Sequence, residues 1–313
     1  MMSTMLTCHV SCVRRSLLDE VGFLRSEFDG SQDWDLVLRI TEQAQRIAHI
    51  PKVLYHWRII PASVAADLAA KPYAVEAGRR AREAALERRG ISGRLEPVEQ
   101  VFGYFRVKYD VVGDPLISII IPTRDNGSVL QRCIASIRET NKYKNYELII
   151  LDNGSVDKDS VSIIQHLDTE SDCRVIRHDQ PFNYSELNNL GVRNANGNIL
   201  LFINDDTELV SEDGIERMLG FAQRPHVGAV GAKLLYPKTR QVQHSGVLNL
   251  ASGPDHAFLY SDAHAPGYFM RNLLEHNWLA VTGACLMIEK RKFQDINGFD
   301  ETLPIAYNDV DLC

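Results

Sequence analysis

The chain has 313 residues, of which 34 are lysine or arginine and 41 are aspartate or glutamate, so its formal charge is -7. This balance provides no overall attraction to nucleic acid or to an anionic membrane, and we expect no nucleic acid partner. Length and apolar content are those of a globular protein with one large domain or two smaller ones.

The two ends of the chain resemble each other. With one single-residue gap, the stretch containing Gly22-Phe23 and Asp33-Trp34-Asp35-Leu36 aligns with Gly298-Phe299 and Asp309-Val310-Asp311-Leu312. The repeat predicts that the chain starts late in one domain and stops at the equivalent point of a second one. The alternative is a chance likeness between two amphipathic segments.

Residues 73–89 are rich in alanine, arginine and glutamate, which predicts a helix. Its interleaved charges favour a solvated connector over a surface that binds nucleic acid. Residues 101–112 alternate as a strand or hairpin does, and Gly113-Asp114-Pro115 predicts a domain boundary.

From Leu116 onward, apolar strands alternate with polar helical segments. This pattern predicts an α/β fold with a mostly parallel sheet flanked by helices on both faces. We expect strands at 116–121, 146–151, 173–177, 199–203, 227–231 and 281–288, and helices at 128–139, 158–167, 184–195 and 213–223. Ligands of such sheets bind beyond the carboxyl ends of the strands, so the residues after each strand are the first candidates for a site.

Polar turns follow the first two strands of this sheet. The first is Pro122-Thr123-Arg124-Asp125-Asn126, and the second begins with Asp152. The carboxylate of Asp152 has the chemistry to accept hydrogen bonds from a nucleotide base or ribose. An Asx turn that caps the next helix explains the same residue equally well.

The adjacent carboxylates Asp205 and Asp206 come directly after the buried strand 199–203. Two such charges repel each other, and a divalent cation bound by oxygen ligands, Mn²⁺ or Mg²⁺, would offset the repulsion and hold a diphosphate. The alternative is a solvated helix N-terminus.

Near the end of the chain, Asp309 is a candidate general base that would remove a proton from an acceptor hydroxyl. Taken alone, an aspartate there more often caps a helix. His244 and His256 flank a loop on the expected acceptor side, where they are either ligands of the substrates or incidental surface histidines.

Residues 115–313 resemble the inverting glycosyltransferases of family 2, which have the GT-A fold of nucleotide-diphospho-sugar transferases. The matching pieces, in chain order, are Ile117–Thr123, Asp152–Ser155, Asn189–Gly191, Asn204–Asp206 and Asn308–Asp309. No single piece is diagnostic, but the five in this order are.

The resemblance implies a role for each candidate residue. Asp309 takes the position of the catalytic base, and Asp205 and Asp206 form the DXD-like motif, in which Asp206 is the expected direct metal ligand. The expected nucleotide-sugar ligands are Pro122, Thr123, Asp125, Asp152, Asn189 and Asp205. Two departures, Asn204 in place of a first aspartate and Asn188 in place of an arginine, bear on metal affinity and base selectivity.

The resemblance, closest to O-antigen and rhamnosyltransferase-like members, also implies the substrates. We expect a UDP- or dTDP-sugar as donor and a saccharide or lipid-linked saccharide as acceptor, in surface polysaccharide biosynthesis. No apolar run is long enough to span a bilayer, and the six cysteines form no CxxC pair. We therefore expect a cytoplasmic protein whose acceptor gives it a peripheral association with the inner face of the membrane.

Three segments follow from these observations. We expect residues 1–70 to be the C-terminal remnant of an upstream transferase domain, residues 71–112 to be a helical linker with a strand or hairpin, and residues 113–313 to be a GT-A domain truncated at its C-terminal end. One alternative function is a truncated, non-catalytic protein that binds nucleotide sugar. A nucleotidyltransferase is the other, although the glycine-rich phosphate loop that it needs after its first strand is missing.

Overall fold

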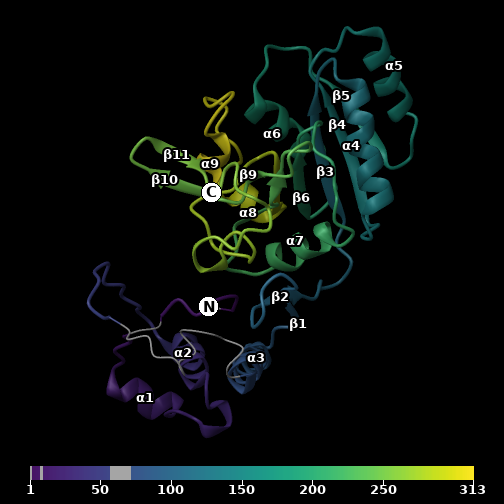
Figure 1. The fold of residues 1–313 in the computed structure, drawn as a ribbon. Coiled ribbons are helices and arrows are strands. Elements are labelled where there is room, and N and C mark those ends of the chain that lie inside the picture. The colour runs from purple at the N-terminus through teal and green to yellow at the C-terminus, as the bar shows by residue number, and fades with distance from the viewer. Residues whose placement is uncertain (1, 8–9, 57–71) are drawn as a thin grey trace. The chain divides into compact units, whose positions relative to one another are not determined.

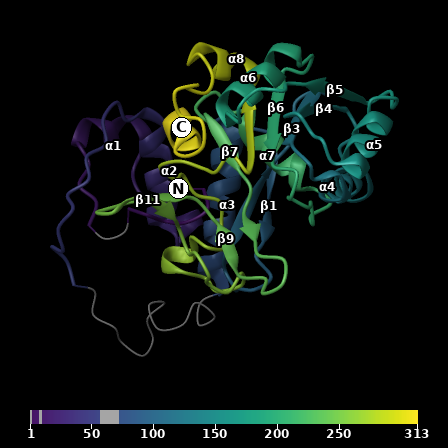
Figure 2. The ribbon, with the colours of Figure 1, turned by 90° about the horizontal axis from the view of Figure 1, so that it is seen from above.

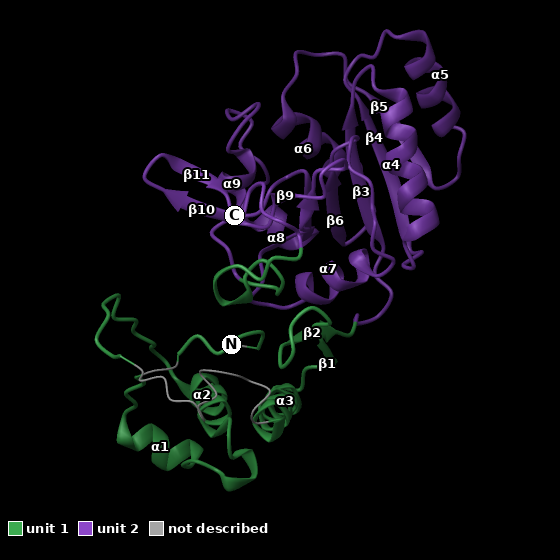
Figure 3. Cartoon of the chain, in the orientation of Figure 1, with its two compact units in different colours: residues 1–110, 264–276 green, residues 111–263, 277–313 purple. Residues whose placement is uncertain are grey.

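A computed structural model describes residues 2–7, 10–56 and 72–313 of the chain. They form two compact units (Figure 3). Unit 1 comprises residues 1–110 and 264–276, and unit 2 comprises residues 111–263 and 277–313. Within the segment 1–70 that we expect to be a domain remnant, residues 1, 8–9 and 57–70 lie outside the described residues.

Unit 2 is built on a six-stranded sheet. In spatial order its strands are β5 (Cys173–Arg177), β4 (Tyr146–Asp152), β3 (Ile117–Thr123), β6 (Ile199–Ile203), β12 (Cys285–Glu289) and β7 (Ala229–Gly231). Strands β3, β4, β5 and β6 run parallel, whereas β12 runs antiparallel to both β6 and β7. The predicted α/β fold with a mostly parallel sheet is confirmed.

Helices cover both faces of this sheet (Figures 1 and 2). Ile119, Ile121 and Ile150 share one buried cluster, whereas Ile120 and Ile149 belong to a second one, because successive strand residues point to opposite faces. The first cluster is completed by α4 (Gly127–Thr140), α5 (Lys158–Leu167) and α7 (Gly214–Ala222), and the second by α6 (Tyr184–Asn194), α8 (Lys290–Asp295) and α9 (Asn308–Leu312). All four helices predicted for this part of the chain are present, to within two residues at each end.

Two short antiparallel pairs lie outside the sheet and were not predicted. They are β8 (Leu234–Leu235) with β9 (Val242–His244) and β10 (Val247–Leu250) with β11 (Gly253–His256). Two of the predicted strands, 227–231 and 281–288, begin later than expected, at Ala229 and at Cys285. Gly283 and Ala284, just before β12, form hydrogen bonds to Asp309 and Asn204 instead of extending the strand.

Unit 1 contains α1 (Arg15–Val21), α2 (Gln32–Gln43), α3 (Pro72–Arg88) and a hairpin of β1 (Gly93–Pro97) and β2 (Phe105–Tyr109), with 3₁₀ turns at Ser26–Phe28 and Tyr268–Met270. The prediction that α3 is solvated on all sides is wrong, whereas its role as a connector stays a prediction. Ala77, Ala81 and Ala85 are buried on one face, and the guanidinium of Arg82, 1% exposed, lies over the rings of Trp34 and Phe105. Apart from Arg82, the charged residues of α3 lie outside this buried face, which is why the composition did not reveal it.

The likeness between the two ends of the chain extends to the local structure. In each case a short helix leads to a glycine in the left-handed region, Gly22 with φ 85° or Gly298 with φ 74°, and then to a second helix. The main-chain N–H of Trp34 donates to Asp33 Oδ1 at 2.9 Å, and that of Val310 donates to Asp309 Oδ1 at 2.9 Å. The two segments therefore share the order of helix, glycine and helix, but not the backbone just before the second helix, where Ser31 has φ -145° and Tyr307 has φ 64°.

Among the described residues, no helix is long and apolar enough to cross a membrane.

Candidate active site

The carboxyl ends of four neighbouring strands gather most of the candidate residues. Thr123 of β3 is paired in register with Asp152 of β4, which is paired with Arg177 of β5. Asp205 follows two residues after the end of β6, the strand on the other side of β3. The sheet thus places the predicted nucleotide and metal residues along one edge, as its parallel order requires.

Asp205 is held by the turn that follows β3. Its Oδ2 accepts hydrogen bonds from Thr123 Oγ1 at 2.7 Å and from Asn126 Nδ2 at 3.3 Å. Burial raises the pKa of Asp205, the hydrogen bonds from Thr123 and Asn126 oppose this rise, and the neighbouring charge of Asp206 adds to it. The Asp205 carboxylate is therefore fixed in place beside the turn that follows β3.

Asp206 differs from Asp205 because its side chain is exposed at the end of the strand. The described residues contain no cluster of three or more histidine, cysteine, aspartate or glutamate side chains that could hold a metal by themselves. A pair of carboxylates nevertheless fits Mn²⁺ or Mg²⁺ when the other ligands are water and diphosphate oxygens, because these hard cations are commonly held by one or two carboxylates.

Asp152 is 3% exposed and both of its oxygens are in use. Oδ1 accepts the main-chain N–H of Ser155 at 2.8 Å, and Oδ2 accepts Arg177 Nη1 at 2.8 Å. The Arg177 side chain is 49% exposed, so a guanidinium lies at the mouth of this position. The expectation that Asp152 caps the next helix is wrong, because Asp157 is the N-cap of α5; Asp152 instead closes the turn at Ser155 and lies at the ligand edge.

Asp125 joins the two polar turns to each other. Its Oδ1 accepts the main-chain N–H groups of Val156 at 2.6 Å and Asp157 at 2.7 Å, and its own N–H donates to Ser155 Oγ at 2.9 Å. The hydrogen bonds from Asp157 and Val156 lower the pKa of the Asp125 carboxyl group. Pro122, within β3, is opposite Leu151 in register and is half-buried.

Asn189 has its amide engaged away from these turns. Nδ2 donates to the main-chain oxygen of Phe299 at 2.9 Å, and Oδ1 accepts the N–H of the same residue at 3.1 Å. Two residues further along α6, a Cβ on Gly191 would lie 2.6 Å from Ile120 Cγ2, so only glycine permits this approach of helix to sheet. The Asn-x-Gly pattern therefore has a packing explanation in this chain, independent of any ligand.

Asp309 lies on α9, and its carboxylate reaches the segment that precedes β12. Oδ2 accepts the main-chain N–H of Gly283 at 2.8 Å. The next residue, Ala284, accepts the main-chain N–H of Asn204 at 3.1 Å and the hydroxyl of Thr207 at 3.4 Å. The candidate base and the turn that carries the acidic pair are thus attached to consecutive residues.

His244 and His256 contact each other, and His244 also bonds to the segment before β12 that holds Asp309. The Nδ1 atoms of His244 and His256 are 2.8 Å apart, and the main-chain N–H of Thr282 donates to His244 Nε2 at 3.3 Å. His244 is 2% exposed, and burial together with the charge of His256 lowers its pKa to about 3. Since Nε2 of His244 accepts, we assign the His244 proton to Nδ1, which then donates to Nδ1 of His256.

Sequence reasoning missed several residues of this site. Arg177 stands at the end of a predicted strand, so the rule that selected Asp152 would also have selected it. Asn126 lies within a turn that was singled out, but nothing in the sequence pairs it with Asp205. Gly283 and Tyr184, whose hydroxyl donates to the Gly283 oxygen at 2.9 Å, gave no signal because only the fold brings them to Asp309.

An acidic turn thus lies at the carboxyl edge of a mostly parallel sheet, where ligands of such sheets bind, and an acidic helix is attached to it through Gly283 and Ala284. The sequence model of glycosyl transferase family 2 matches residues 118–296, more than half of the chain. The chain therefore belongs to glycosyl transferase family 2.

Relatives and a solved structure agree with this family. The uncharacterized protein y4gI of Sinorhizobium fredii is 45% identical and the O-antigen biosynthesis protein RfbC of Myxococcus xanthus is 35% identical, each over 97% of this chain. The chain spans 34% and 24% of the length of these two proteins. A crystal structure of GalNAc-T7 with UDP, GalNAc and Mn²⁺ aligns with a TM-score of 0.51 and 14% identity, over 69% of this chain and 43% of that one, which shows a common GT-A fold.

Proposed function

We propose that this chain carries the donor-binding and catalytic face of an inverting glycosyltransferase. Its substrates would be a nucleoside-diphosphate sugar, of the UDP or dTDP type, and a hydroxyl of a saccharide or lipid-linked saccharide. The observation that carries the proposal is the attachment of Asp309 and of the Asn204–Thr207 turn to the consecutive residues Gly283 and Ala284. Because two consecutive main-chain residues join them, the candidate base and the acidic pair belong to one site.

The donor end of the site is assigned to the turns after β3, β4 and β6. Asp152 and Thr123 lie beside each other in register, with Arg177 exposed next to Asp152. We assign Asp152 and Pro122 to the nucleoside, and Arg177 adds a positive charge suited to an anionic donor. Asp125 and Asn189 act through the main chain they hold, as positioning residues for the turns at 155–157 and at Phe299.

Asp205 and Asp206 would hold the divalent cation, with Asp206 as the more accessible ligand. When bound, Mn²⁺ or Mg²⁺ supplies positive charge that stabilises the departing diphosphate. The structure of GalNAc-T7 contains both UDP and Mn²⁺, which supports a metal-assisted donor site in this fold. Thr123 and Asn126 keep Asp205 oriented toward this role.

The chemical step is a single displacement. The acceptor oxygen attacks the anomeric carbon, the bond from that carbon to the diphosphate oxygen breaks with its electron pair, and Asp309 receives the hydroxyl proton. Main-chain N–H groups of Gly283 and Val310 hold the carboxylate of Asp309 in position to accept it. Attack opposite the leaving group inverts the anomeric configuration.

The RfbC likeness supports a place in surface polysaccharide biosynthesis. In such a pathway a lipid-linked acceptor would bring the chain to the inner face of the membrane from the cytoplasm. For the domain organisation, we propose that residues 113–313 are the transferase domain, that residues 1–70 derive from a second copy, and that residues 71–112 connect them. The parallel local structures around Asp33 and Asp309 support this division.

The test separates binding from turnover. Donor hydrolysis and transfer are measured for the unchanged chain, for Asp206→Ala and for Asp309→Asn, with UDP binding in the presence of Mn²⁺ followed by calorimetry. We expect Asp309→Asn to lower kcat by about 10²–10⁴-fold, because a general base accelerates the chemical step. The dissociation constant of UDP should change by only a few-fold, because the base does not take part in donor binding. Asp206→Ala should lose the Mn²⁺-dependent part of UDP binding.

The exposed Asp159 on α5 provides a matched control, Asp159→Asn, which should change neither quantity. Normal turnover in both site variants would disprove the assignment. A non-catalytic nucleotide-sugar-binding chain is the second candidate, favoured by the engagement of both Asp309 oxygens with main-chain N–H groups. Tight UDP binding with no turnover in the unchanged chain would establish it.

A further inference from the structure

In unit 2, the main chain that leads into β12 is attached on one side to the segment 244–247. The main-chain N–H of Val247 donates to the Ala280 oxygen at 2.9 Å, and the two residues form an antiparallel bridge. Two residues further along, the N–H of Thr282 donates to a side chain, at 3.3 Å from Nε2 of His244. A side chain therefore extends the attachment that the main chain begins.

The fit between these two segments is close. Gly246 has φ 131°, in the region that favours glycine, and a Cβ on it would lie 2.2 Å from ring atoms of Trp278. The contacts at Trp278, Ala280 and Thr282 follow one another at every second residue. The bond to His244 is thus the last of a regular series of contacts.

The position of Thr282 bears on Asp309 through one residue of main chain. The peptide group that carries the Thr282 N–H and the next one, whose Gly283 N–H donates to Asp309 Oδ2 at 2.8 Å, are both planar. Only the φ and ψ angles of Thr282 separate these two planes. The hydroxyl of Thr282 also accepts the N–H of Ala284 at 3.4 Å, which restrains the two angles. A shift of Thr282 would therefore redirect the N–H that reaches Asp309.

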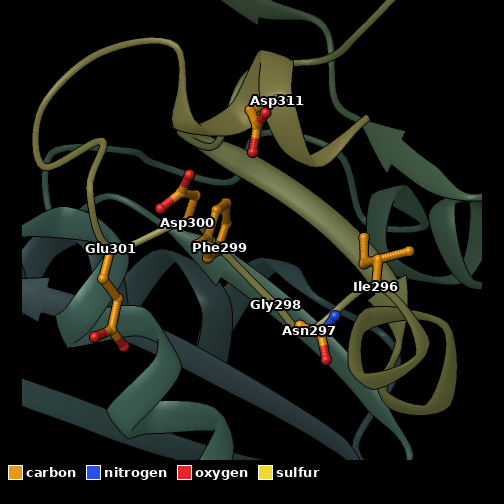
Figure 4. A pocket seen from close by; sticks show the side chains of 7 residues that line it. All are labelled: Ile296, Asn297, Gly298, Phe299, Asp300, Glu301 and Asp311. Atoms are coloured by element: carbon orange, nitrogen blue, oxygen red, sulfur yellow. The ribbon is translucent and has the colours of Figure 1, made fainter.

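This attachment acts on one side of α9. Figure 4 shows the Asp311 side chain of this helix pointing toward the segment that carries Phe299 and Asp300. Asp309 lies two positions earlier, so it points to another side of the helix, where Gly283 bonds to it. The hydrogen bond that orients Asp309 therefore comes from the main chain before β12 and not from the loop beside Asp311.

His244 accepts from Thr282 only as a neutral ring with its proton on Nδ1. A neutral imidazole has one donor and one acceptor nitrogen, whereas a charged one has two donors. His244 is 2% exposed, and burial lowers its pKa to about 3, so the ring is neutral at about pH 7. Its Nδ1 proton then points to Nδ1 of His256 at 2.8 Å. The pair can form in this way only if Nδ1 of His256 accepts.

His256 is therefore the residue that fixes the tautomer of His244. The ring planes are 89° apart, so the rings meet through their nitrogen atoms and are not stacked. A group with donors alone at position 256 would face the Nδ1 proton of His244 and favour the other tautomer, in which Nε2 carries the proton and no longer accepts from Thr282. His256 lies on β11 and is exposed, so it can be replaced without opening the core.

We propose that His244 is a positioning residue of the transfer reaction, which holds Thr282 and through it the Gly283 N–H that orients Asp309. In this role His256 keeps His244 in the accepting tautomer, and neither histidine has to touch a substrate. The inference rests on the proposed transferase function. It gives the pair a role other than the two considered from the sequence, substrate ligands or incidental surface histidines.

The variants His256→Gln and His256→Lys test the tautomer. Glutamine offers an oxygen that accepts from Nδ1 of His244, whereas lysine has donors alone. We expect kcat for transfer to stay within about threefold in His256→Gln and to fall by about 10–100-fold in His256→Lys, with KM for the donor little changed, because a displaced catalytic group affects the chemical step. His226→Lys, which places the same charge at another exposed histidine, should leave kcat unchanged.

A second measurement follows the attachment without any turnover. Nitrogen-15 resonances of the His244 ring report which nitrogen carries the proton, and amide hydrogen exchange reports on the N–H groups of Thr282 and Gly283. In the unchanged chain and in His256→Gln we expect the proton on Nδ1 and slow exchange at both amides. In His256→Lys the proton should move to Nε2, and both amides should exchange about 10-fold faster.

The outcomes separate this inference from the proposed function. The same His244 tautomer and the same amide exchange in His256→Gln and His256→Lys would overturn the inference. A changed tautomer with equal kcat in the two variants would overturn it as well, because the attachment would then have no bearing on the reaction. Absence of transfer by the unchanged chain would refute the proposed function, while the tautomer and the amide exchange still decide whether His244 holds the segment that orients Asp309.

Discussion

The carboxylate of Asp309 accepts a hydrogen bond from the main-chain N–H of Gly283 at 2.8 Å. Through Gly283 and Ala284 it is linked to the main chain of Asn204, the first residue of the acidic turn. The spacing between candidate base and acidic pair is therefore set by backbone atoms.

Gly283→Ala should disturb this link. The added Cβ would lie 2.8 Å from the hydroxyl of Tyr184, which is closer than carbon and oxygen normally approach, so either the main chain at 283 or the Tyr184 ring, which bonds to it, must move. We expect kcat for transfer to fall by about 10²-fold, as for a displacement of catalytic groups by about 1 Å, with UDP binding little changed. Steady-state kinetics and calorimetry measure the two effects.

The clash offers its own control. Tyr184→Phe removes the hydroxyl, so the double variant Gly283→Ala with Tyr184→Phe should recover part of the lost kcat. Gly228→Ala, where a Cβ would meet nothing within 4 Å, should leave kcat unchanged. Equal activity of Gly283→Ala and Gly228→Ala would contradict the proposed link.

Thr123→Val should make the metal site more sensitive to acid. The hydrogen bond from Thr123 opposes the rise that burial causes in the pKa of Asp205, so its loss raises that pKa further. Protonated Asp205 cannot bind Mn²⁺, and the fall of Mn²⁺-dependent UDP affinity with decreasing pH should therefore begin at higher pH in the variant. Calorimetry between pH 4.5 and 8 gives the profile.

Thr169→Val serves as the comparison, because that hydroxyl bonds to His166 on the exposed end of α5. Its pH profile should match that of the unchanged chain. A Thr123→Val profile displaced to lower pH would show that Asp205 titrates for another reason.

His244 should make unit 2 less stable in mild acid. Burial first, and then the charge of His256, lower its pKa from 6.5 to about 3, so between these values the unfolded chain binds a proton that the folded chain does not. This contribution to stability is complete above pH 6.5 and is lost as the pH falls toward 3, by about 2 kcal/mol from pH 7 to pH 5. Urea unfolding at several pH values measures it.

In His244→Gln this part of the pH dependence should be absent. His276, in unit 1, also has a pKa lowered by burial, to about 4. His276→Gln should therefore weaken the pH dependence of the unfolding free energy of unit 1 and leave that of unit 2 unchanged. An unchanged slope of unit 2 in His244→Gln would refute the assignment.

Asn189→Ala distinguishes a structural role from a ligand role. Both amide atoms of Asn189 bond to the main chain of Phe299, and Nδ2 also donates to Glu301 Oε1 at 3.0 Å, so the loss of three hydrogen bonds should cost about 3 kcal/mol of unfolding free energy. We expect UDP affinity to change by less than threefold at a temperature where the chain stays folded. Asn194→Ala, further along the same helix with one bond to Leu190, should cost less. A large loss of UDP affinity at constant stability would instead make Asn189 a donor ligand.

The sequence alone predicted the central strands of the sheet of unit 2 because they are nearly continuous apolar runs. Ile117–Thr123 and Ile199–Ile203 are buried on both faces, which leaves a strong pattern and clear ends. The acidic pair and Asp152 were found by the same logic, since they follow such strands directly.

The remaining parts left weaker signals. β8 to β11 are two to four residues long and carry no lasting alternation. The buried face of α3 consists of alanines whose pattern is hidden by charges on the other face. The residues before β12 matter because that strand runs opposite to its neighbour β6, so its amino end reaches the edge where the parallel strands end. Reading only the residues after each strand cannot detect them.

The antiparallel direction of β12 has a mechanical consequence. Gly283 and Ala284 lie where this strand meets the acidic turn, and their peptide groups hold α9 on one side and Asn204 on the other. A displacement of the turn when a donor enters would be transmitted to α9 through two rigid peptide planes, with no flexible side chain between them on the turn side. Donor entry and alignment of the proton acceptor would then be parts of one movement, which would order the two substrates in time.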